Sequence, residues 1–217
     1  MVQQLEDLPN ELLRLFMEYL PSPDLFRGFF DLNQRLNTIL RSLHYRIDVR
    51  QTNRSEFDFV VGGVLPNIDL HWIESLYIND IMDRLHSIEP CKHLRSLAIH
   101  HLRTQTIARL ANHVLPTLKK LTHLRLSSEL ALKDSDVNIL TAVVFSVQMP
   151  SLTFCHFAFE DFGHMKFDHL TTTNRSLSLK CLIIDHWCGL RDFLQLLHCV
   201  PNIHQLTVRL FDHDLYG

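Results

Sequence analysis

Glycine is scarce in this sequence, and its scarcity excludes the common phosphate-binding loops. The 217 residues include six glycines, at positions 28, 62, 63, 163, 189 and 217. They form no G-x-G-x-x-G segment, no Walker-type loop and no G-x-S-x-G turn of the kind that presents a catalytic serine. Phosphate-loop and serine-hydrolase chemistry are therefore not indicated, and we expect no cofactor.

Long apolar runs are also missing. The longest nearly apolar run covers residues 140–147, far short of the roughly 18 to 20 residues that cross a bilayer. Glu6 and Asp7 lie where a signal peptide would be apolar. The five cysteines form no C-x-x-C pair, which is typical of reduced, mostly buried thiols. We predict a cytoplasmic or nuclear protein, or one found in both places.

Neither sign of charge dominates. The sequence has 21 Lys and Arg against 24 Asp and Glu, so its formal net charge is −3. Residues 1–54 include no basic tail. Because such a balance gives no general attraction to polyanions, we expect no nucleic acid and no membrane among the partners.

The fifteen histidines do not form a metal-binding motif. H-E-x-x-H is absent, and the closest pairs, His100-His101 and Asp185-His186, are adjacent residues that would point to opposite faces of a strand. We predict no metal site. A metal-dependent hydrolase is therefore the weakest of three functional hypotheses.

The first 43 residues predict three short helices. Apolar residues recur at steps of three and four over residues 9–20, with Asp7 as the expected N-cap. We expect Ser22 to cap a second helix, and Asp31 or Asn33 to begin a third. Three helices of this length cannot bury all their apolar side chains among themselves, so the surplus needs another surface.

This head resembles the F-box motif. The resemblance covers about residues 8–43 and is carried by Leu8-Pro9-Asn10-Glu11-Leu12-Leu13, Phe16, Tyr19-Leu20 and Pro23-Asp24-Leu25. Two departures are Leu36, at the place of the family's late tryptophan, and Leu32-Asn33, in place of its usual Val-Cys.

F-box proteins are substrate receptors of SCF (Skp-cullin-F-box) ubiquitin ligases, and their helices bind a Skp adaptor that bridges to a cullin. The resemblance implies a non-catalytic protein that acts in ubiquitin-dependent protein catabolism. It also implies that the adaptor-binding residues are Leu8, Pro9, Leu12, Phe16, Leu20 and Leu25. The alternative is that these side chains dock the helices onto the chain's own body, because periodicity does not separate the two cases.

From residue 73 onward a short apolar pattern, L-x-x-L-x-L with conservative replacements, recurs six times. Helical patterns lie between several copies, and the one before the last copy predicts an apolar stripe of Leu190, Phe193, Leu194 and Leu197. Pro90, Pro116, Pro150 and Pro201 precede the next copy. The copies are Ile73/Leu76/Ile78, Leu94/Leu97/Ile99, Leu121/Leu124/Leu126, Leu152/Cys155/Phe157, Leu179/Leu182/Ile184 and Ile203/Leu206/Val208.

This alternation resembles a leucine-rich-repeat solenoid. The resemblance implies an α/β fold with parallel strands on a concave side and helices on a convex side. We predict a three-helix F-box-like head over residues 1–43, a packed junction over 44–66 and the solenoid over 67–217. A compact α/β domain with incidental leucine spacing is the alternative. No capping helix follows the last copy, which indicates a fragment, a frayed last repeat or one covered by a dimer partner.

Alternate strand side chains of such a solenoid face its concave side, where we expect one or more protein targets to bind. The predicted target-binding residues combine aromatic, basic and acidic side chains: Tyr77, His100, His123, Arg125, Phe154, His156 and Asp185. For any one of them, a merely solvated strand position is an equally good interpretation. His123 and His156 would make binding depend on pH near 6 to 7.

The leading hypothesis from the sequence is a substrate-recognition subunit of an SCF ubiquitin ligase, which recruits a target for ubiquitination. The alternative is a non-ligase leucine-rich-repeat interaction scaffold. Neither function requires catalytic residues in this chain.

Overall fold

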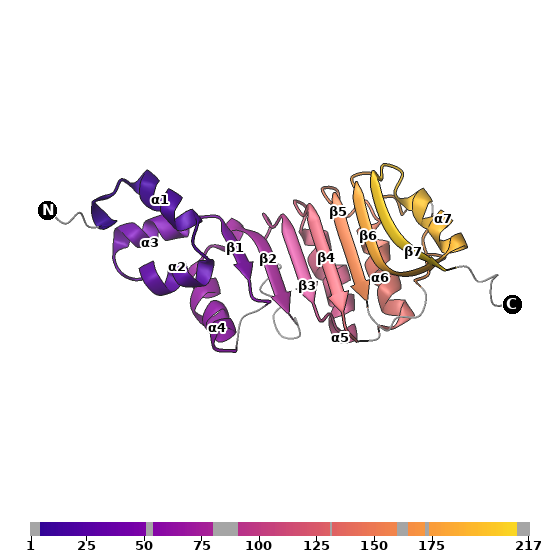
Figure 1. Ribbon diagram of the computed structural model, residues 1–217, viewed down its shortest axis with the longest axis horizontal. Coiled ribbons are helices and arrows are strands. Elements are labelled where there is room, and N and C mark those ends of the chain that lie inside the picture. Colours follow the sequence, from indigo (N-terminus) through magenta and orange to yellow (C-terminus); the bar gives the residue numbers. More distant parts are fainter. Residues whose placement is uncertain are drawn as a thin grey trace.

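The computed structural model describes residues 5–50, 54–79, 91–130, 132–159, 165–171 and 174–211. It is an elongated α/β molecule, with three helices at its N-terminal end and a row of parallel strands along the rest (Figure 1). Within the part of the chain that is described, no helix combines the length and the apolar character needed to cross a membrane.

The head contains the three expected helices, α1 (Asn10–Glu18), α2 (Ser22–Phe29) and α3 (Gln34–Arg41). Asn33 caps α3, because its side chain accepts a hydrogen bond from the Leu36 amide at 2.8 Å.

The other two predicted caps are wrong. Asp7 ends a separate 3-10 turn, and the N-cap position of α1 is Pro9. Ser22 is the first residue of α2, and its hydroxyl donates to the Arg46 carbonyl oxygen at 3.2 Å instead of capping the helix. That bond ties α2 to the first strand.

Seven strands form one parallel sheet, with each strand beside its neighbours in chain order. The strands are β1 (Tyr45–Asp48), β2 (Ile73–Asn79), β3 (Ser96–His100), β4 (His123–Ser128), β5 (Phe154–Phe159), β6 (Cys181–Gly189) and β7 (Gln205–Phe211). All six copies of the apolar pattern contain a strand, as predicted, and a described helix lies between β3 and β4, between β4 and β5 and between β6 and β7.

The sheet begins one strand earlier than predicted. β1 lies in the segment 44–66, which we expected to be a junction, and it pairs in parallel with β2. The sequence does contain a signal, because Leu43, Tyr45, Ile47 and Val49 alternate with polar residues and all four are buried. The segment is short and does not match L-x-x-L-x-L, so the repeat search missed it.

The rest of that segment also repeats a later part of the body. Helix α4 (Arg54–Phe59) continues through a π-helical turn (Val60–Val64) into a 3-10 turn (Leu65–Asn67). Helix α5 is followed by turns of the same kinds and lengths; the bounds are Thr104–Arg109, Leu110–Val114 and Leu115–Thr117. A Val-Leu-Pro tripeptide marks the end of both units, at 64–66 and at 114–116. The expected junction is therefore a strand–helix unit of the body.

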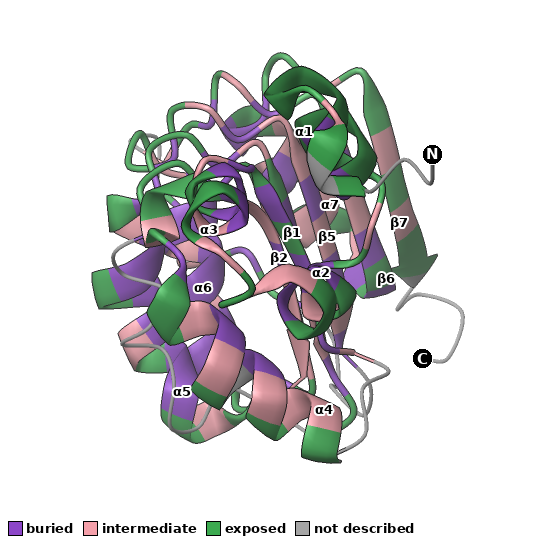
Figure 2. Cartoon of the chain, turned by 90° about the vertical axis from the view of Figure 1, so that its left-hand side faces the viewer, coloured by how far each residue is buried: buried purple, intermediate pink, exposed green. Residues whose placement is uncertain are grey.

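Helices α4, α5 and α6 (Asp134–Val144) lie on the same side of the sheet (Figure 2). Helix α7 (Leu190–Cys199) contacts β6 and β7. Its buried residues are Leu196 and Cys199, whereas Leu190 and Leu194, which belong to the predicted stripe, are 63% and 51% exposed. The apolar residues of α7 fit two overlapping stripes, and packing against the two strands selects one of them.

One connected apolar core runs from the head into the last repeat, from Leu13 to Val200. Strand residues that point toward the helices stack in register, as Leu97, Leu124, Cys155 and Leu182 do. Each large apolar side chain buried in this way stabilises the fold by roughly 1.5 to 3 kcal/mol. All five cysteines are free, and Cys181 is the one that is not buried.

A ladder of backbone hydrogen bonds joins the starts of successive strands. The amides of Thr122 and His123 both donate to the carbonyl oxygen of Arg95, at 2.8 and 2.9 Å. The same pair of hydrogen bonds recurs one strand later, where the Thr122 carbonyl oxygen accepts from the amides of Thr153 and Phe154, both at 2.9 Å. The pair recurs at the next two steps, on the carbonyl oxygens of Thr153 and Lys180. These bonds hold the strand ends level, so the outward side chains form rows across the sheet.

Candidate binding surfaces

Helix α1 has two apolar faces. Its inward residues, Leu13 and Met17, are fully buried in the core. Its outward apolar residues, together with one that follows its last turn, are exposed to solvent: Leu12 by 50%, Leu15 by 50%, Phe16 by 45% and Tyr19 by 82%. We call these four residues the α1 apolar face. Such a contiguous patch is what remains when a helix has more apolar surface than its own chain covers.

The predicted adaptor-binding residues divide into two groups. Leu12 and Phe16 belong to the α1 apolar face, Pro9 is exposed, and Leu8 and Leu20 are partly buried against the core. Leu25 does not belong to an exposed surface, because it is 3% exposed and packed inside the head. The corrected surface therefore excludes Leu25.

Sequence reasoning left Leu15 and Tyr19 out of the predicted surface, although they contribute much of its exposed apolar area. The available signal is their spacing from Leu12 and Phe16, because steps of three and four place all four on one side of a helix. The adaptor-binding residues implied by the F-box resemblance did not include these two, although Tyr19 is one of the residues that carry the resemblance.

The α1 apolar face is held firmly on the head. The Phe16 ring packs edge-on against the Phe29 ring, with centroids 6.3 Å apart. The Arg35 guanidinium in α3 donates to the Asn10 side chain at 2.7 Å and to the Leu8 carbonyl oxygen. Leu36, which replaces the tryptophan of the F-box pattern, is 2% exposed and lies in the core. It therefore adds no side chain to the surface.

The second surface is the side of the sheet opposite α4, α5 and α6, which we call the open face. One row of side chains in register contains Tyr77, Ala98, Arg125 and His156, on β2 to β5. Adjacent strands lie about 4.8 Å apart, so neighbours in a row are close enough to contact one partner together.

The seven predicted target-binding residues all lie on this open face, and none of them is buried. His123, Arg125 and Asp185 are exposed, whereas the others are partly buried. Ala98 is the exception among the outward positions of β3, because it is 1% exposed between larger neighbours. The outward alternation predicted from the sequence is thus confirmed for the residues of the site.

Phe154 forms the centre of an aromatic and basic cluster. Its ring stacks on the His123 imidazole, with centroids 5.6 Å apart and planes 26° apart. The Arg125 guanidinium lies over the same ring, 5.2 Å from its centroid. A cation above an aromatic face is held electrostatically and keeps its hydrogen-bond donors at the surface. Arg125 therefore presents a positioned positive charge.

A further basic residue, Arg50, was missed because β1 was not recognised. Arg50 follows β1 and forms an ion pair with Asp48, in which its Nε lies 2.9 Å from a carboxylate oxygen. Its guanidinium also lies 4.7 Å from the centre of the Tyr77 ring, and its carbonyl oxygen accepts a hydrogen bond from the Asn79 side-chain Nδ2. These contacts link the C-terminal ends of β1 and β2.

Two titratable groups here have shifted pKa values. Hydrogen bonds from Arg50 lower the pKa of the Asp48 carboxyl group, because they favour its charged form. The pKa of His100 is lowered chiefly by partial burial and secondly by the Arg50 charge. The His100 Nδ1 lies 2.9 Å from the Ser127 hydroxyl. Both groups therefore keep their ordinary states at neutral pH, with Asp48 charged and His100 neutral.

His156 and Asp185 form a pair across β5 and β6, with Nε2 and a carboxylate oxygen 2.7 Å apart. Such a pair can orient a proton donor. Two side chains do not make a metal site, and the described residues supply no third metal ligand beside them. In the described part of the chain, no group of three or more His, Cys, Asp or Glu residues is arranged to hold a metal ion. The open face offers hydrogen bonds, charge and aromatic surface to a partner.

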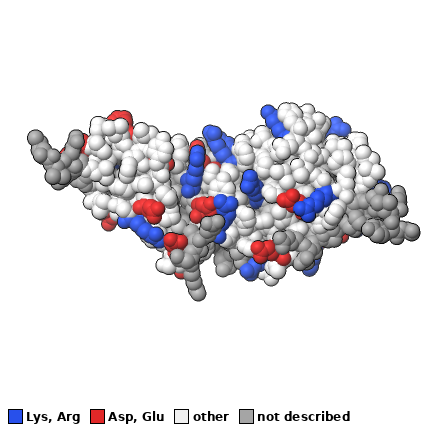
Figure 3. All heavy atoms as spheres, in the orientation of Figure 1, with Lys and Arg blue, Asp and Glu red and all other residues white. Residues whose placement is uncertain are grey.

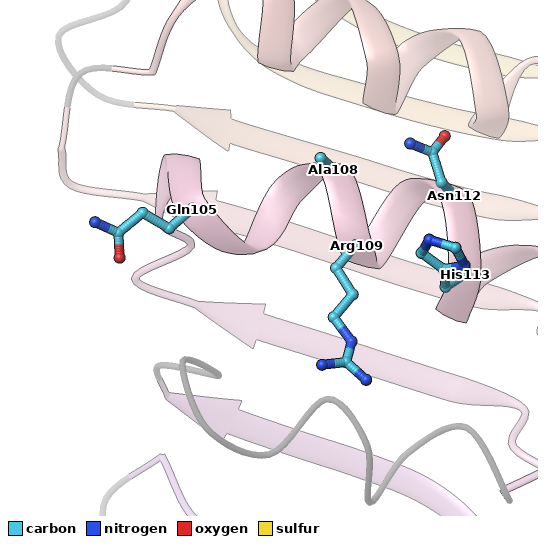
Figure 4. A pocket seen from close by; sticks show the side chains of 5 residues that line it. All are labelled: Gln105, Ala108, Arg109, Asn112 and His113. Atoms are coloured by element: carbon cyan, nitrogen blue, oxygen red, sulfur yellow. The ribbon is translucent and has the colours of Figure 1, made fainter.

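The helical side of the body carries a shallow hollow of a different kind. It is lined by five side chains along α5 and the turn after it (Figure 4): Gln105, Ala108, Arg109, Asn112 and His113. None of these is a predicted site residue.

No protein-family model and no curated protein sequence matches this chain. The two surfaces must therefore be interpreted from their own geometry and chemistry.

Proposed function

We propose that this protein is the substrate-recognition subunit of an SCF ubiquitin ligase. The α1 apolar face would bind a Skp adaptor and, through it, a cullin. The open face of the sheet would hold the target protein. The chain itself would do no chemistry, and ubiquitin transfer would be accelerated because target and charged conjugating enzyme are kept close together.

The observation that carries this proposal is the exposure of the α1 apolar face. Leu12, Leu15, Phe16 and Tyr19 lie on a helix that already buries Leu13 and Met17. A protein that left this area in water without a partner would lose hydrophobic free energy and risk aggregation. The F-box resemblance of the same residues names the partner class, a Skp adaptor.

The arrangement of the two surfaces supports the same function. The head lies at one end of the elongated molecule, and the row of strands extends away from it, with each strand running across the long axis (Figure 1). The core is continuous between them. A target on the open face would therefore be kept at a defined distance from an adaptor on α1.

The test is capture by a purified Skp adaptor, followed by size-exclusion chromatography. The wild-type protein should form a complex, whereas Leu12→Asp combined with Phe16→Asp should lose it. Burial of these two side chains is worth roughly 3 to 6 kcal/mol, so affinity should fall at least about a hundredfold. Because both residues are exposed, the melting temperature should stay close to that of the wild type.

A matched control is available at the other end of the molecule. Leu190 and Leu194 in α7 are as exposed as Leu12 and Phe16, so Leu190→Asp with Leu194→Asp removes comparable apolar surface there. This variant should still bind the adaptor. Retained binding by the α1 variant, or no binding by the folded wild type, would contradict the proposal.

The alternative is a non-ligase interaction scaffold, and one observation favours it. Leu25, which the F-box resemblance assigns to the adaptor, is buried in the chain's own core, and so is Leu36, which replaces the family's tryptophan. A folded protein that fails to bind the adaptor, yet binds proteins through the open face, would be this scaffold.

A further inference from the structure

We propose that the open face recognises an extended acidic segment whose carboxylates are four residues apart. This inference rests on the proposed function, in which the same face holds the target, and it defines the chemistry of that target. It concerns a surface separate from the α1 apolar face.

The first argument is the charge on the open face. Outward positions of the strands carry Arg46, Arg125 and Arg209 against Asp48 and Asp185, and Glu74, at the register shift of β2, lines the same hollow as Arg46. Asp48 forms an ion pair with Arg50, and the Asp185 carboxylate lies 2.7 Å from the His156 Nε2. None of the three arginines forms an ion pair with a described carboxylate. A chain with net charge −3 thus keeps unpaired positive charge on this face.

Figure 3 looks onto the side of the molecule that carries the open face, and there basic and acidic groups are mixed, with no large area of one sign. General attraction to polyanions is therefore not expected. Selectivity would come from the positions of the unpaired arginines, not from a broad field.

The second argument is the spacing of these arginines. Arg46 lies on β1, Arg125 on β4 and Arg209 on β7, so each is three strands from the next. At about 4.8 Å per strand, three strands span roughly 14 Å. Four residues of an extended chain span about 13 Å, and residues i, i+4 and i+8 point to the same side. Carboxylates at those positions would meet the three arginines.

The arginines lie on a diagonal, because Arg46 is in the row of His123 and Arg125 is two residues further along β4. That offset lengthens the separation to roughly 16 Å. The long, flexible arginine side chain covers the difference. The matching segment would therefore cross the strands obliquely.

The third argument is the apolar area on β5 and β6, next to Arg125. Ile183 lies in the row of Arg125, and Phe154 and Cys181 lie in the neighbouring row of His123; all three are partly buried. The His123 stack and the Arg125 contact hold the Phe154 ring in place. An apolar side chain midway between the second and third carboxylates, at position i+6, would lie over this area. The occupant is thus acidic with one apolar anchor.

The experiment measures fluorescence anisotropy of a labelled eleven-residue peptide with the full chain. The peptide has glutamate at positions 1, 5 and 9, leucine at position 7, and serine or threonine elsewhere. A second peptide has lysine in place of each glutamate, and a third moves the central glutamate to position 4, which turns it to the other side. The first peptide should bind most tightly, and its affinity should fall as salt is added.

The variant Arg125→Glu should weaken binding of the first peptide about tenfold, because it replaces attraction with repulsion at the central contact. Arg191→Glu makes the same charge change on α7, where Arg191 is exposed, and it should leave binding unchanged. Circular dichroism and melting temperature confirm that both variants are folded.

Three results would overturn the inference: no binding of the first peptide to folded wild type, equal binding of the lysine peptide, or unchanged binding by Arg125→Glu. Adaptor capture is measured on the same preparations. Failure of the peptide with capture intact would reject this inference alone. Loss of capture with the peptide still bound would reject the proposed ligase function and leave the acidic target of a scaffold.

Discussion

Two adjacent leucines in α1 have opposite environments, since Leu12 is 50% exposed and Leu13 is fully buried. A helix turns about 100° per residue, so neighbours in the sequence face different surroundings. Residue type alone therefore did not reveal which leucine belongs to the core. The same holds for Leu25, which matches the F-box pattern by identity and yet is buried.

His169 gives a test at this scale. Its Nε2 lies 2.8 Å from the Thr141 hydroxyl, and burial lowers its pKa below the ordinary 6.5. The unfolded chain therefore binds this proton more readily than the folded chain, so stability is lost as the pH falls below about 6.5. We expect a lower melting temperature at pH 5 than at pH 7.5, and a smaller difference in His169→Gln.

His198→Gln is the control for this prediction, because His198 is exposed on α7. It should keep the wild-type pH dependence. His100, whose pKa is also lowered, accounts for part of the dependence that remains in His169→Gln. An identical pH dependence in wild type and His169→Gln, measured by thermal unfolding, would contradict the assignment.

At the scale of elements, the sequence predicted best where a periodic pattern was long or repeated. The six copies of the apolar pattern all contain strands, and the three head helices all form. β1 was missed because four alternating residues make a weak signal by themselves. The buried side of α7 was also mispredicted, because two stripes fit its sequence and contacts with β6 and β7 decide between them.

The cap of α3 provides a prediction about an element. Asn33 accepts a hydrogen bond from the Leu36 amide, an N–H that the helix itself cannot satisfy. Asn33→Ala should destabilise the protein by about 1 kcal/mol in urea unfolding, whereas Asn33→Asp should stay near wild type because aspartate is an equally good cap. Equal losses for both variants would show that the cap is not the reason.

At the scale of the molecule, the head and the sheet share one apolar core. Ser22 and Arg46 add a hydrogen bond between α2 and β1. The two proposed binding surfaces therefore lie on one packed structure, although they face different partners. This continuity predicts that the head and the body unfold together.

The two tryptophans can report on that cooperativity from opposite ends of the sheet. Trp72 lies beside His44 near the head, with ring centroids 5.0 Å apart, and Trp187 lies on β6. The variants Trp72→Phe and Trp187→Phe each keep one tryptophan. When the two variants are compared under conditions that give them the same overall stability, the remaining tryptophan should report the same unfolding midpoint in both. Leu124→Ala, at the centre of the core, should lower the free energy of unfolding by about 2 to 5 kcal/mol. It should shift the unfolding midpoint reported by each tryptophan by the same amount. Separate transitions would contradict a shared core.

From residue 73 onward, the order of the described strands and helices follows from the sequence by itself, because apolar periodicity is local and each of these units carries its own pattern. The outward alternation of the open-face residues follows for the same reason. Which apolar faces are covered, and which side chains meet across strands, was decided by the tertiary structure. The pairing of Arg125 with Phe154 and the exposure of Leu12 beside buried Leu25 depend on how units distant in the sequence stack. Contacts between units that are distant in the sequence produce no periodic pattern in the amino-acid sequence.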